Sequence, residues 1–257
     1  MDIASIAGIA LAIIGILAGM VIEGGNIGQI TQPTAAMIVF GGTLGAVMLQ
    51  FPLETVLAAF RKALQVFTGK KKNPVQAMKQ IVEFANKARR SGIVSLDQDL
   101  NKINDLFLKQ AIMLAVDGTE PSELRTIMEI QIENRAQSEE RIPAVFESAG
   151  GFSPTIGIIG AVLGLIQVMQ HLDKIDEVGK GIAVAFVATI YGVGMANLVL
   201  LPAAGKLKIR IQEDRLHREM LLEGVISILE GMNPRMVEIK LQSFLPEDPK
   251  RKAPARA

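Results

Sequence analysis

The sequence predicts an all-α integral membrane protein with four transmembrane helices and a helical cytoplasmic domain. Its mean hydropathy of +0.34 is too high for an ordinary soluble domain, yet 21% of the residues are charged. Several apolar segments are long enough to cross a bilayer. No strand-like alternation and no repeat of solenoid length is found. Together, these observations indicate helices in the membrane joined to helices in water.

Four apolar segments are candidate spans. A helix rises about 1.5 Å per residue, so about 20 residues cross the roughly 30 Å of hydrocarbon. The first segment follows Met1 and Asp2 without a basic leader and is longer than the apolar core of a signal peptide, so we expect a retained span. The four segments cover approximately residues 3–22, 34–53, 153–172 and 182–203.

The connections between the segments predict the topology. Residues 23–33 (EGGNIGQITQP) and 173–181 (DKIDEVGKG) are short polar hairpins, whose only basic residues are Lys174 and Lys180. Because basic residues favour the cytoplasmic side, the positive-inside rule places the long segments and both termini in the cytoplasm. The predicted parts are a first hairpin (1–53), a cytoplasmic loop (54–152), a second hairpin (153–205) and a cytoplasmic tail (206–257).

Helix start and stop signals divide the cytoplasmic part. Asn73 and Pro74 begin a helix that runs to Ser91-Gly92. Ser95 is a candidate cap for a second helix over residues 96–118, and Pro121 begins a third that leads almost directly into the third span. In the tail, an amphipathic helix from Arg210 is expected to end at Gly231.

The composition excludes several classes of function. The chain has no cysteine and two histidines, so disulfides, thiolate metal sites and a His-rich metal site are not expected. No paired acids beside a plausible cleft, nucleophile constellation or phosphate-binding loop is found, so we predict no enzyme and no cofactor. The 27 basic and 26 acidic residues nearly balance, which gives no reason to expect a nucleic-acid partner.

The predicted spans carry no acidic, lysine or arginine side chain near their middle. Asp2, Glu23 and Asp173 lie at the ends of the apolar segments. A charge near the bilayer centre costs about 2.5–3.5 kcal/mol even on the lenient insertion scale, so a buried acid usually serves a purpose. This chain therefore either transports no ions, or depends on a titrating acid from a partner helix.

Small residues, prolines and a threonine mark the last two spans, and each has two readings. The small side chains allow either tight packing within one chain or a smooth surface for another helix. Pro154 and Pro202 either bend the spans or, as the simpler reading, end them at the cytoplasmic face. Thr189 either lines a water path or, more simply, bonds its own preceding turn. The small residues are Gly157, Gly160, Ala161 and Gly164 in the third span, and Gly192, Gly194 and Ala196 in the fourth.

Motifs along nearly the whole chain, to about Pro246, resemble the A subunit of the bacterial flagellar stator, the MotA/PomA family. The order of two spans, a helical loop of about a hundred residues and two further spans is similar to that family. Each motif is weak alone, but together they are specific: IEGGNIG, ARRSGIVSLDQD, FLKQAIMLAVDG, SPTIGIIGAVLGLI, AFVATIYG, LLPAAGKL and EGMNPR.

The resemblance implies an ion-driven rotary motor. In the family, five A subunits are thought to surround the single spans of two MotB-type B subunits, whose aspartates take up protons or sodium ions. Spans three and four would form the wall facing these helices, and spans one and two would face lipid. The implied wall residues are Pro154, Gly157, Gly160, Ala161, Gly164, Phe186, Thr189, Tyr191 and Pro202.

The resemblance also implies a rotor contact and a transported ion. Arg89, Arg90 and Asp97 match charged loop positions that engage the rotor protein FliG, although the family often has Glu where this chain has Asp97. For the two arginines, a solvated end of a helix is the alternative reading. Ala161 replaces a threonine of sodium-driven members and so removes an oxygen ligand, from which we expect a proton motor. Remaining alternatives are an ExbB/TolQ-like energising subunit and a non-conducting membrane scaffold.

Overall fold

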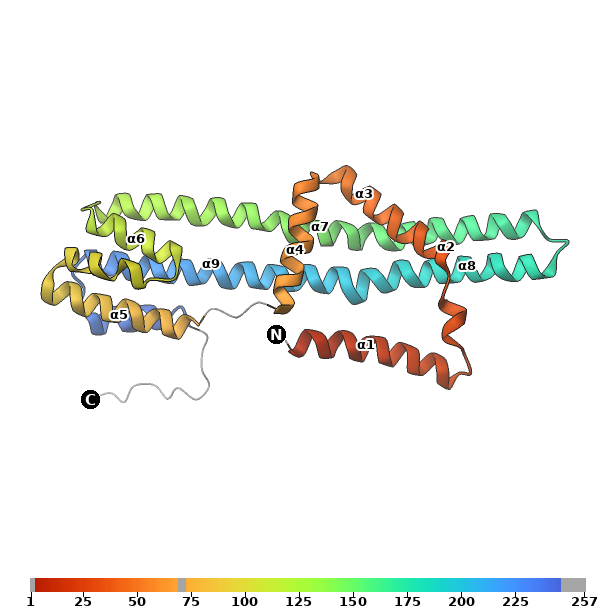
Figure 1. The fold of residues 1–257 in the computed structure, drawn as a ribbon, viewed down its shortest axis with the longest axis horizontal. Helices are drawn as coiled ribbons and strands as arrows, with labels where there is room; N and C mark the ends of the chain where they lie inside the picture. The colour runs from red at the N-terminus through yellow and green to blue at the C-terminus, as the bar shows by residue number, and fades with distance from the viewer. Residues whose placement is uncertain (1–2, 69–72, 246–257) are drawn as a thin grey trace. The chain divides into compact units, whose positions relative to one another are not determined.

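The computed structural model describes residues 3–68 and 73–245, and every regular element in these residues is a helix (Figure 1). Met1, Asp2, Lys70, Lys71, Lys72 and the last part of the predicted tail lie outside them. The chain divides into two compact units. The span unit comprises residues 1–70 and 138–210, and the loop unit comprises residues 71–137 and 211–257. An all-helical fold is therefore confirmed for the described residues.

The span unit begins with an apolar helix and an interrupted second one. A 3-10 turn, η1 (Ile27–Ile30), joins α1 (Ile3–Ile22) to the second helix and has a capping box formed by Asn26 and Gln29. The second helix is one run in which a π-helical segment, η2, interrupts the α-helical pattern. It consists of α2 (Pro33–Ala36), η2 (Met37–Gly41) and α3 (Gly42–Gln50), and α4 (Leu53–Thr68) follows after a two-residue break.

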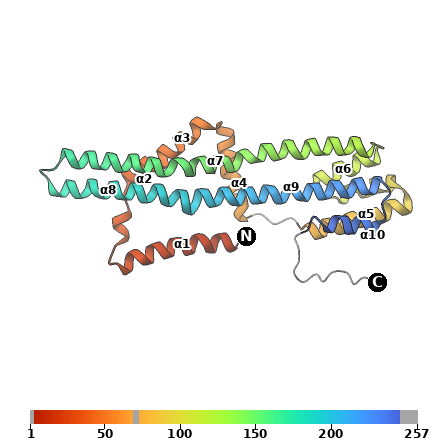
Figure 2. The ribbon, with the colours of Figure 1, turned by 180° about the vertical axis from the view of Figure 1, so that it is seen from behind.

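Two long helices run through both units. Helix α7 (Pro121–Gln170) joins the predicted third loop helix and the third span in one element. A four-residue turn leads to α8 (Ile175–Gly194), which continues through a π-helical segment, η4 (Met195–Leu200), into α9 (Leu201–Leu229). Within the span unit, Figures 1 and 2 show α8 lying beside α7. The predicted run from the third loop helix into the third span is thus confirmed.

Two boundary predictions are wrong. Pro154 lies inside α7 and Pro202 lies within the continuous run Ile175–Leu229, so neither proline ends a helix. A proline removes one hydrogen bond from a helix, and a span tolerates this loss when neighbouring helices pack against it on both sides of the proline. The predicted fourth span starts at residue 182, and the helix that contains it, α8, begins earlier, at Ile175, where Asp176 and Glu177 in the first turn suit the helix dipole. The tail helix expected from Arg210 is a continuation of that same run.

The loop unit contains α5 (Pro74–Ser91), the 3-10 helix η3 (Ile93–Lys102), α6 (Leu106–Val116) and α10 (Pro234–Gln242), with the adjoining parts of α7 and α9. Asn73 caps α5 by accepting from the Val75 and Gln76 amides, as predicted. The single helix predicted over residues 96–118 is wrong, because Asp105 caps α6 instead and interrupts the run. Gly231, with φ of +70°, follows the end of α9 as expected.

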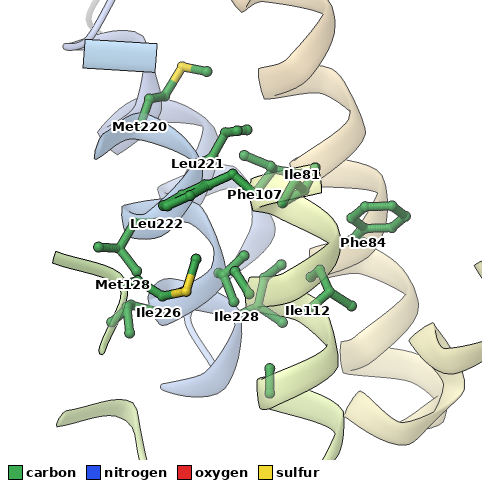
Figure 3. Close-up of a cluster of buried hydrophobic side chains, with 14 of the residues drawn as sticks. Ile81, Phe84, Phe107, Ile112, Met128, Met220, Leu221, Leu222, Ile226 and Ile228 are labelled. Atoms are coloured by element: carbon green, nitrogen blue, oxygen red, sulfur yellow. The ribbon is translucent and has the colours of Figure 1, made fainter. Parts of the chain in front are cut away.

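The loop unit has the larger core. Apolar side chains from α5, η3, α6, α7, α9 and α10 enclose one another, and Figure 3 labels Ile81, Phe107 and Ile226 among them. In the span unit, one small cluster joins α3 and α4 to α7 and α9, and another joins Ala35 and Val39 to Val187 and Ala188.

Three helices are long and apolar enough to cross a membrane: Pro33–Gln50, Pro121–Gln170 and Ile175–Leu229. Within α1, the run Ile6–Ile22 counts as a shorter apolar helix. These assignments rest on the length and composition of the described residues. The prediction of four spans is therefore supported for three, and the fourth stays a prediction.

Candidate functional site

Glycines bring α7 and α8 into backbone contact. A methyl group on Gly157 would lie 2.8 Å from the Ala188 carbonyl oxygen, and one on Gly164 would lie 2.8 Å from the Gly181 carbonyl oxygen. On Gly160, it would lie 2.8 Å from the Ala188 Cβ atom. Such distances leave no space for a side chain, so close packing needs these glycines. For Gly157, Gly160 and Gly164, the structure supports the reading of tight packing within one chain.

The opposite face of α7 remains exposed within this chain. Ala161 is half-buried, and Phe186 of α8 is 69% exposed. Packing α8 against the glycines thus turns large apolar side chains outward, where lipid, another copy or a partner helix can cover them. On α7 these side chains are Ile158, Ile159, Val162, Leu163, Ile166 and Met169.

Pro154 lies where α7 and α8 approach each other closely. A methyl group on Gly192 would lie 2.6 Å from the Ser153 carbonyl oxygen and 3.3 Å from the Pro154 Cα atom. The Ser153 side chain is fully buried, and its hydroxyl has no partner among the described residues. Because a proline at position 154 removes the bond to the carbonyl of Gly150, this level of α7 combines a weakened helix with a buried polar group.

Tyr191 ties the fourth span to the first hairpin, a contact that the sequence did not reveal. Its hydroxyl donates to the Ile30 carbonyl oxygen at 2.5 Å, and its ring stacks on Phe40 with centroids 5.9 Å apart. The Gln32 amide donates to the same hydroxyl at 3.4 Å. Tyr191 is the single tyrosine of the sequence, which could have drawn attention to it. Its hydrogen-bond partners lie about 160 residues away, so the sequence could not show which groups it contacts.

Thr189 follows the simpler of its two readings. Its hydroxyl donates to the Ala185 carbonyl oxygen one turn earlier, at 3.2 Å, and the side chain is half-buried. This bond satisfies the hydroxyl donor within α8. The oxygen can still accept a hydrogen bond from another group.

Charged side chains flank the apolar part of the helix pair. Residues 148–172 of α7 and 181–205 of α8, η4 and α9 contain no Asp, Glu, Lys or Arg. At one end, Glu177 pairs with Lys174 at 3.2 Å and with His171 at 3.3 Å. At the other end, Lys208 pairs with Glu147 at 2.6 Å. The uncharged stretch therefore has an ionic boundary at each end.

The predicted rotor residues lie close together in sequence around a tight turn of the loop unit. Arg89 and Arg90 are exposed in the last turn of α5, and Asp97 is exposed in η3. Gly92, with φ of +78°, reverses the chain between them, and the Ser95 hydroxyl closes the turn by donating to the Gly92 carbonyl at 2.7 Å. Within the described residues, no ion pair is found for these three charged side chains.

Asp99 in η3, unlike Asp97, forms ion pairs with two lysines. Lys102 and Lys87 donate to its carboxylate at 2.8 and 2.6 Å, and these hydrogen bonds hold the pKa of Asp99 below its usual range. The bond from Lys87 joins α5 to η3 and holds the turn between them. The structure thus distinguishes a carboxylate used internally from the exposed charges of Arg89, Arg90 and Asp97.

An ion-pair network joins three helices of the loop unit. Glu223 of α9 pairs with Arg125 of α7 and, at 2.6 Å, with Lys240 of α10. Burial disfavours the Glu223 carboxylate, but the hydrogen bonds from Arg125 and Lys240 outweigh it and lower the pKa of Glu223. The Glu223 bond also raises the pKa of Arg125. Sequence spacing cannot reveal this network, because its members lie on three separate helices.

Helices with long uncharged stretches and glycine-mediated contacts, in a chain that also has a charged helical unit, are typical of membrane proteins whose helices pack closely against one another. The family described as the MotA/TolQ/ExbB proton channel family matches residues 99–220, and a Motility protein A N-terminal model matches residues 6–92. Both matches agree with the motifs found in the sequence.

Individual relatives match almost the whole chain. Motility protein A of Bacillus subtilis (strain 168) is 35% identical over 96% of this chain and 92% of its own length. Chemotaxis protein PomA of Vibrio alginolyticus is 31% identical, with 96% of each chain covered. The solved structure of C. jejuni MotAB has a TM-score of 0.92 at 34% identity and covers 98% of this chain and 99% of its own.

The chain belongs to the MotA/TolQ/ExbB proton channel family. Within that family it is a stator subunit of the bacterial flagellar motor, of the motility protein A type. The family consists of channel and stator subunits and is not a class of enzymes.

Proposed function

We propose that this chain and a MotB-type partner with a single span couple proton flow across the bacterial inner membrane to torque on the rotor. One observation carries the proposal: residues 148–172 and 181–205 contain no acidic or basic residue apart from histidine. A proton that crosses beside them needs a titrating group, which a partner aspartate supplies. The solved relatives titled as MotAB complexes support a partner of this kind.

The partner helix is proposed to contact the exposed faces of α7 and α8. Ala161, Phe186 and Thr189 contribute side chains to this wall, and Pro154 and Pro202 shape its backbone. Gly157, Gly160, Gly164 and Tyr191 support it from behind, because they hold α8 and the first hairpin close. Several copies of the chain, five in the proposed assembly, surround the partner helices, and the outer helices face lipid.

The energy of one proton is sufficient for a step. An elementary charge that crosses 100 mV releases about 2.3 kcal/mol, which is comparable to the cost of a charged carboxylate in the membrane. Neutralising the partner's aspartate lets its helix leave the wall of one subunit and approach the next. Repeated steps rotate the ring of A-type subunits around the partner.

The charged turn of the loop unit is proposed to pass torque to FliG. Exposed ion pairs are worth only about 0–1 kcal/mol each, so contacts through Arg89, Arg90 and Asp97 can form and break at every step. In a motile strain, Arg90→Glu is expected to leave the chain in the membrane and the filaments assembled, but to stop rotation. Pro154→Leu is expected to stop rotation by altering the wall.

The transported ion is proposed to be the proton. A bare sodium ion needs several oxygen ligands, whereas a proton needs only the carboxylate, and Ala161 offers no oxygen. Replacing sodium with potassium at constant pH is expected to leave swimming speed unchanged. Motility that is lost without sodium would contradict this assignment.

Reconstitution provides the decisive test. Liposomes that contain this chain alone are expected to retain a pH gradient, and liposomes with both chains are expected to dissipate it when a potential is applied. Changing the partner's aspartate to asparagine is expected to abolish the flux. Proton conduction by the chain alone would overturn the proposal, and no flux with either partner form would indicate a non-conducting scaffold.

A further inference from the structure

Two buried hydroxyl groups of the span unit have no hydrogen-bond partner among the described residues. The Ser153 side chain of α7 is fully enclosed, and the Thr43 side chain of α3 is 8% exposed. Burying a hydroxyl without a hydrogen bond is costly, so nearly all such groups in folded proteins are bonded to protein or to ordered water. Both hydroxyls therefore call for a ligand that can donate and accept hydrogen bonds.

A contact between α3 and α7 places the two hydroxyls at a similar level. A methyl group on Gly42 would lie 2.8 Å from the Ile156 Cγ2 atom, so α3 touches α7 at this point. Thr43 is next to Gly42. Ser153 precedes Ile156 by three residues, or about 4.5 Å along the axis. In Figures 1 and 2, the helix run that contains α3 crosses α7. Thr43 and Ser153 therefore lie within about one turn of the same crossing.

Thr43 faces the run that leads from α8 into η4. It lies one turn after Val39, which packs in a cluster with Ala188. It also lies one turn before Val47, which packs in a cluster with Leu200. Residues four apart share a face of a helix, so Thr43 points toward the part of the run between Ala188 and Leu200.

Ser153 faces the same part of that run from α7. A methyl group on Gly192, which lies between Ala188 and Leu200 in sequence, would be 2.6 Å from the Ser153 carbonyl oxygen. Gly157, one turn after Ser153 on the same face of α7, lies against the Ala188 carbonyl. The two hydroxyls are thus directed to the place where α3, α7 and α8 meet.

The backbone at this crossing also offers hydrogen-bond acceptors. Pro154 has no N–H, so the Gly150 carbonyl loses its usual helical donor. Met195 begins the π-helical segment η4, where the regular pattern of helical bonds is interrupted. In membrane helices, carbonyls freed by a proline are bonded by Ser or Thr side chains and by ordered water. The crossing therefore combines donors and acceptors that suit water as a ligand.

The helices at the crossing carry small residues. Gly42, Gly150 and Gly192 all lie at points of close approach. A methyl group on the half-buried Gly194 would meet no atom within 4 Å, so the packing is not tight throughout. One water molecule needs only about 10–15 Å³ of space and two or more polar partners.

We infer that the span unit binds ordered water at the crossing of α3, α7 and α8, held by the hydroxyls of Ser153 and Thr43. The water completes the hydrogen bonds of both hydroxyls and is placed to bond the Gly150 carbonyl. Because water can change partners while the side chains stay in place, the site allows α7 to bend at Pro154 with its polar groups still bonded. The inference goes beyond the proposed function and does not require that the chain take part in proton flow.

The direct test is a structure of the full complex with its single-span partner in lipid, at a resolution that shows ordered water. A density peak about 2.7–3.0 Å from both hydroxyl oxygens is expected. Hydroxyls that bond each other or a backbone carbonyl, with no peak between them, would overturn the inference.

Apolar replacements distinguish hydrated hydroxyls from dry ones by the sign of their effect. Ser153→Ala and Thr43→Val each take one partner from the water and are expected to lower the thermal midpoint of the complex by about 2–4 °C. The double variant is expected to lose less than the sum, because the two hydroxyls share one site. In a dry site, the same changes remove an unsatisfied polar group and raise the midpoint. A raised midpoint, or losses that simply add, would overturn the inference.

Thr34→Val is the matched control. It makes the same change as Thr43→Val in the same helix run, but the Thr34 side chain is exposed. The midpoint is therefore expected to change by about 1 °C or less. If Thr34→Val lowers the midpoint as much as Thr43→Val, the loss comes from the change of side chain in this helix and not from a buried site, which also overturns the inference.

Discussion

The loop unit and the span unit differ in the kind of packing that holds each of them together internally. In the loop unit, large side chains are enclosed: Ile81, Leu108, Ile112, Met128 and Ile226 are all less than 2% exposed. Among the largest fully buried side chains of the described residues, only Val39 belongs to the span unit. There, α7 and α8 meet through backbone atoms at Gly157, Gly164 and Gly192.

The difference follows from the solvent. In water, burying apolar side chains stabilises the fold by about 25 cal/mol per Å², so the loop unit places its large residues inside. In lipid, exposed apolar side chains cost little, and close contact between small residues holds helices together. The span unit can thus leave Ile158, Val162 and Phe186 on its outer faces without loss. These faces remain available to other helices.

The largest effect is expected from truncating the core of the loop unit. Ile112→Ala removes a fully enclosed side chain and should destabilise the unit by about 2–5 kcal/mol. Hydrogen exchange of α5 and α6 peptides in the complex would measure this as faster amide opening. The matched change Ile130→Ala, on a side chain that is 56% exposed, should alter opening by less than about 0.5 kcal/mol. Equal effects of the two variants would contradict the assigned core.

The next largest effect is expected where the helices of the span unit touch. Gly192→Ala would place a methyl group 2.6 Å from the Ser153 carbonyl oxygen and should cost about 1–3 kcal/mol. Gly194→Ala, two residues further on, meets no atom within 4 Å and should be neutral or slightly stabilising. The thermal midpoint of the purified complex and swimming speed would both report the contrast. If both variants behave alike, backbone contact is not what holds α7 to α8.

Sequence reasoning succeeded where the determining signal is local. Asn73 and Pro74 fix the start of α5 through hydrogen bonds within three residues, and the apolar runs predict the spans by length alone. It failed where distant packing decides. Pro154 was predicted to end a helix, but α7 continues through it, and Gly192 of α8 packs against α7 at Ser153 and Pro154. Neither the cap at Asp105 in place of Ser95 nor the bond from Tyr191 to Ile30 follows from spacing.

A smaller, pH-dependent effect is expected from the network in the loop unit. The folded-state pKa of Glu223 is lowered, so its contribution to stability is present above its unfolded pKa of about 4.3 and is lost as the pH falls through the folded value. Glu223→Gln should therefore cost about 1–2 kcal/mol at neutral pH. The gap between parent and variant should narrow below about pH 4.3 in thermal melts of the complex. A gap that is constant with pH would exclude the carboxylate as its source.

The smallest effect is expected at Tyr191, whose side chain makes both a hydrogen bond to the backbone and an aromatic contact. Tyr191→Phe removes the hydrogen bond to the Ile30 carbonyl but keeps the ring on Phe40, so a loss of about 0.5–1.5 kcal/mol is expected. Tyr191→Leu should cost more, because the stacked ring is also lost. If the phenylalanine variant melts with the parent, water reaches Ile30 and the first hairpin is held by its apolar contacts alone.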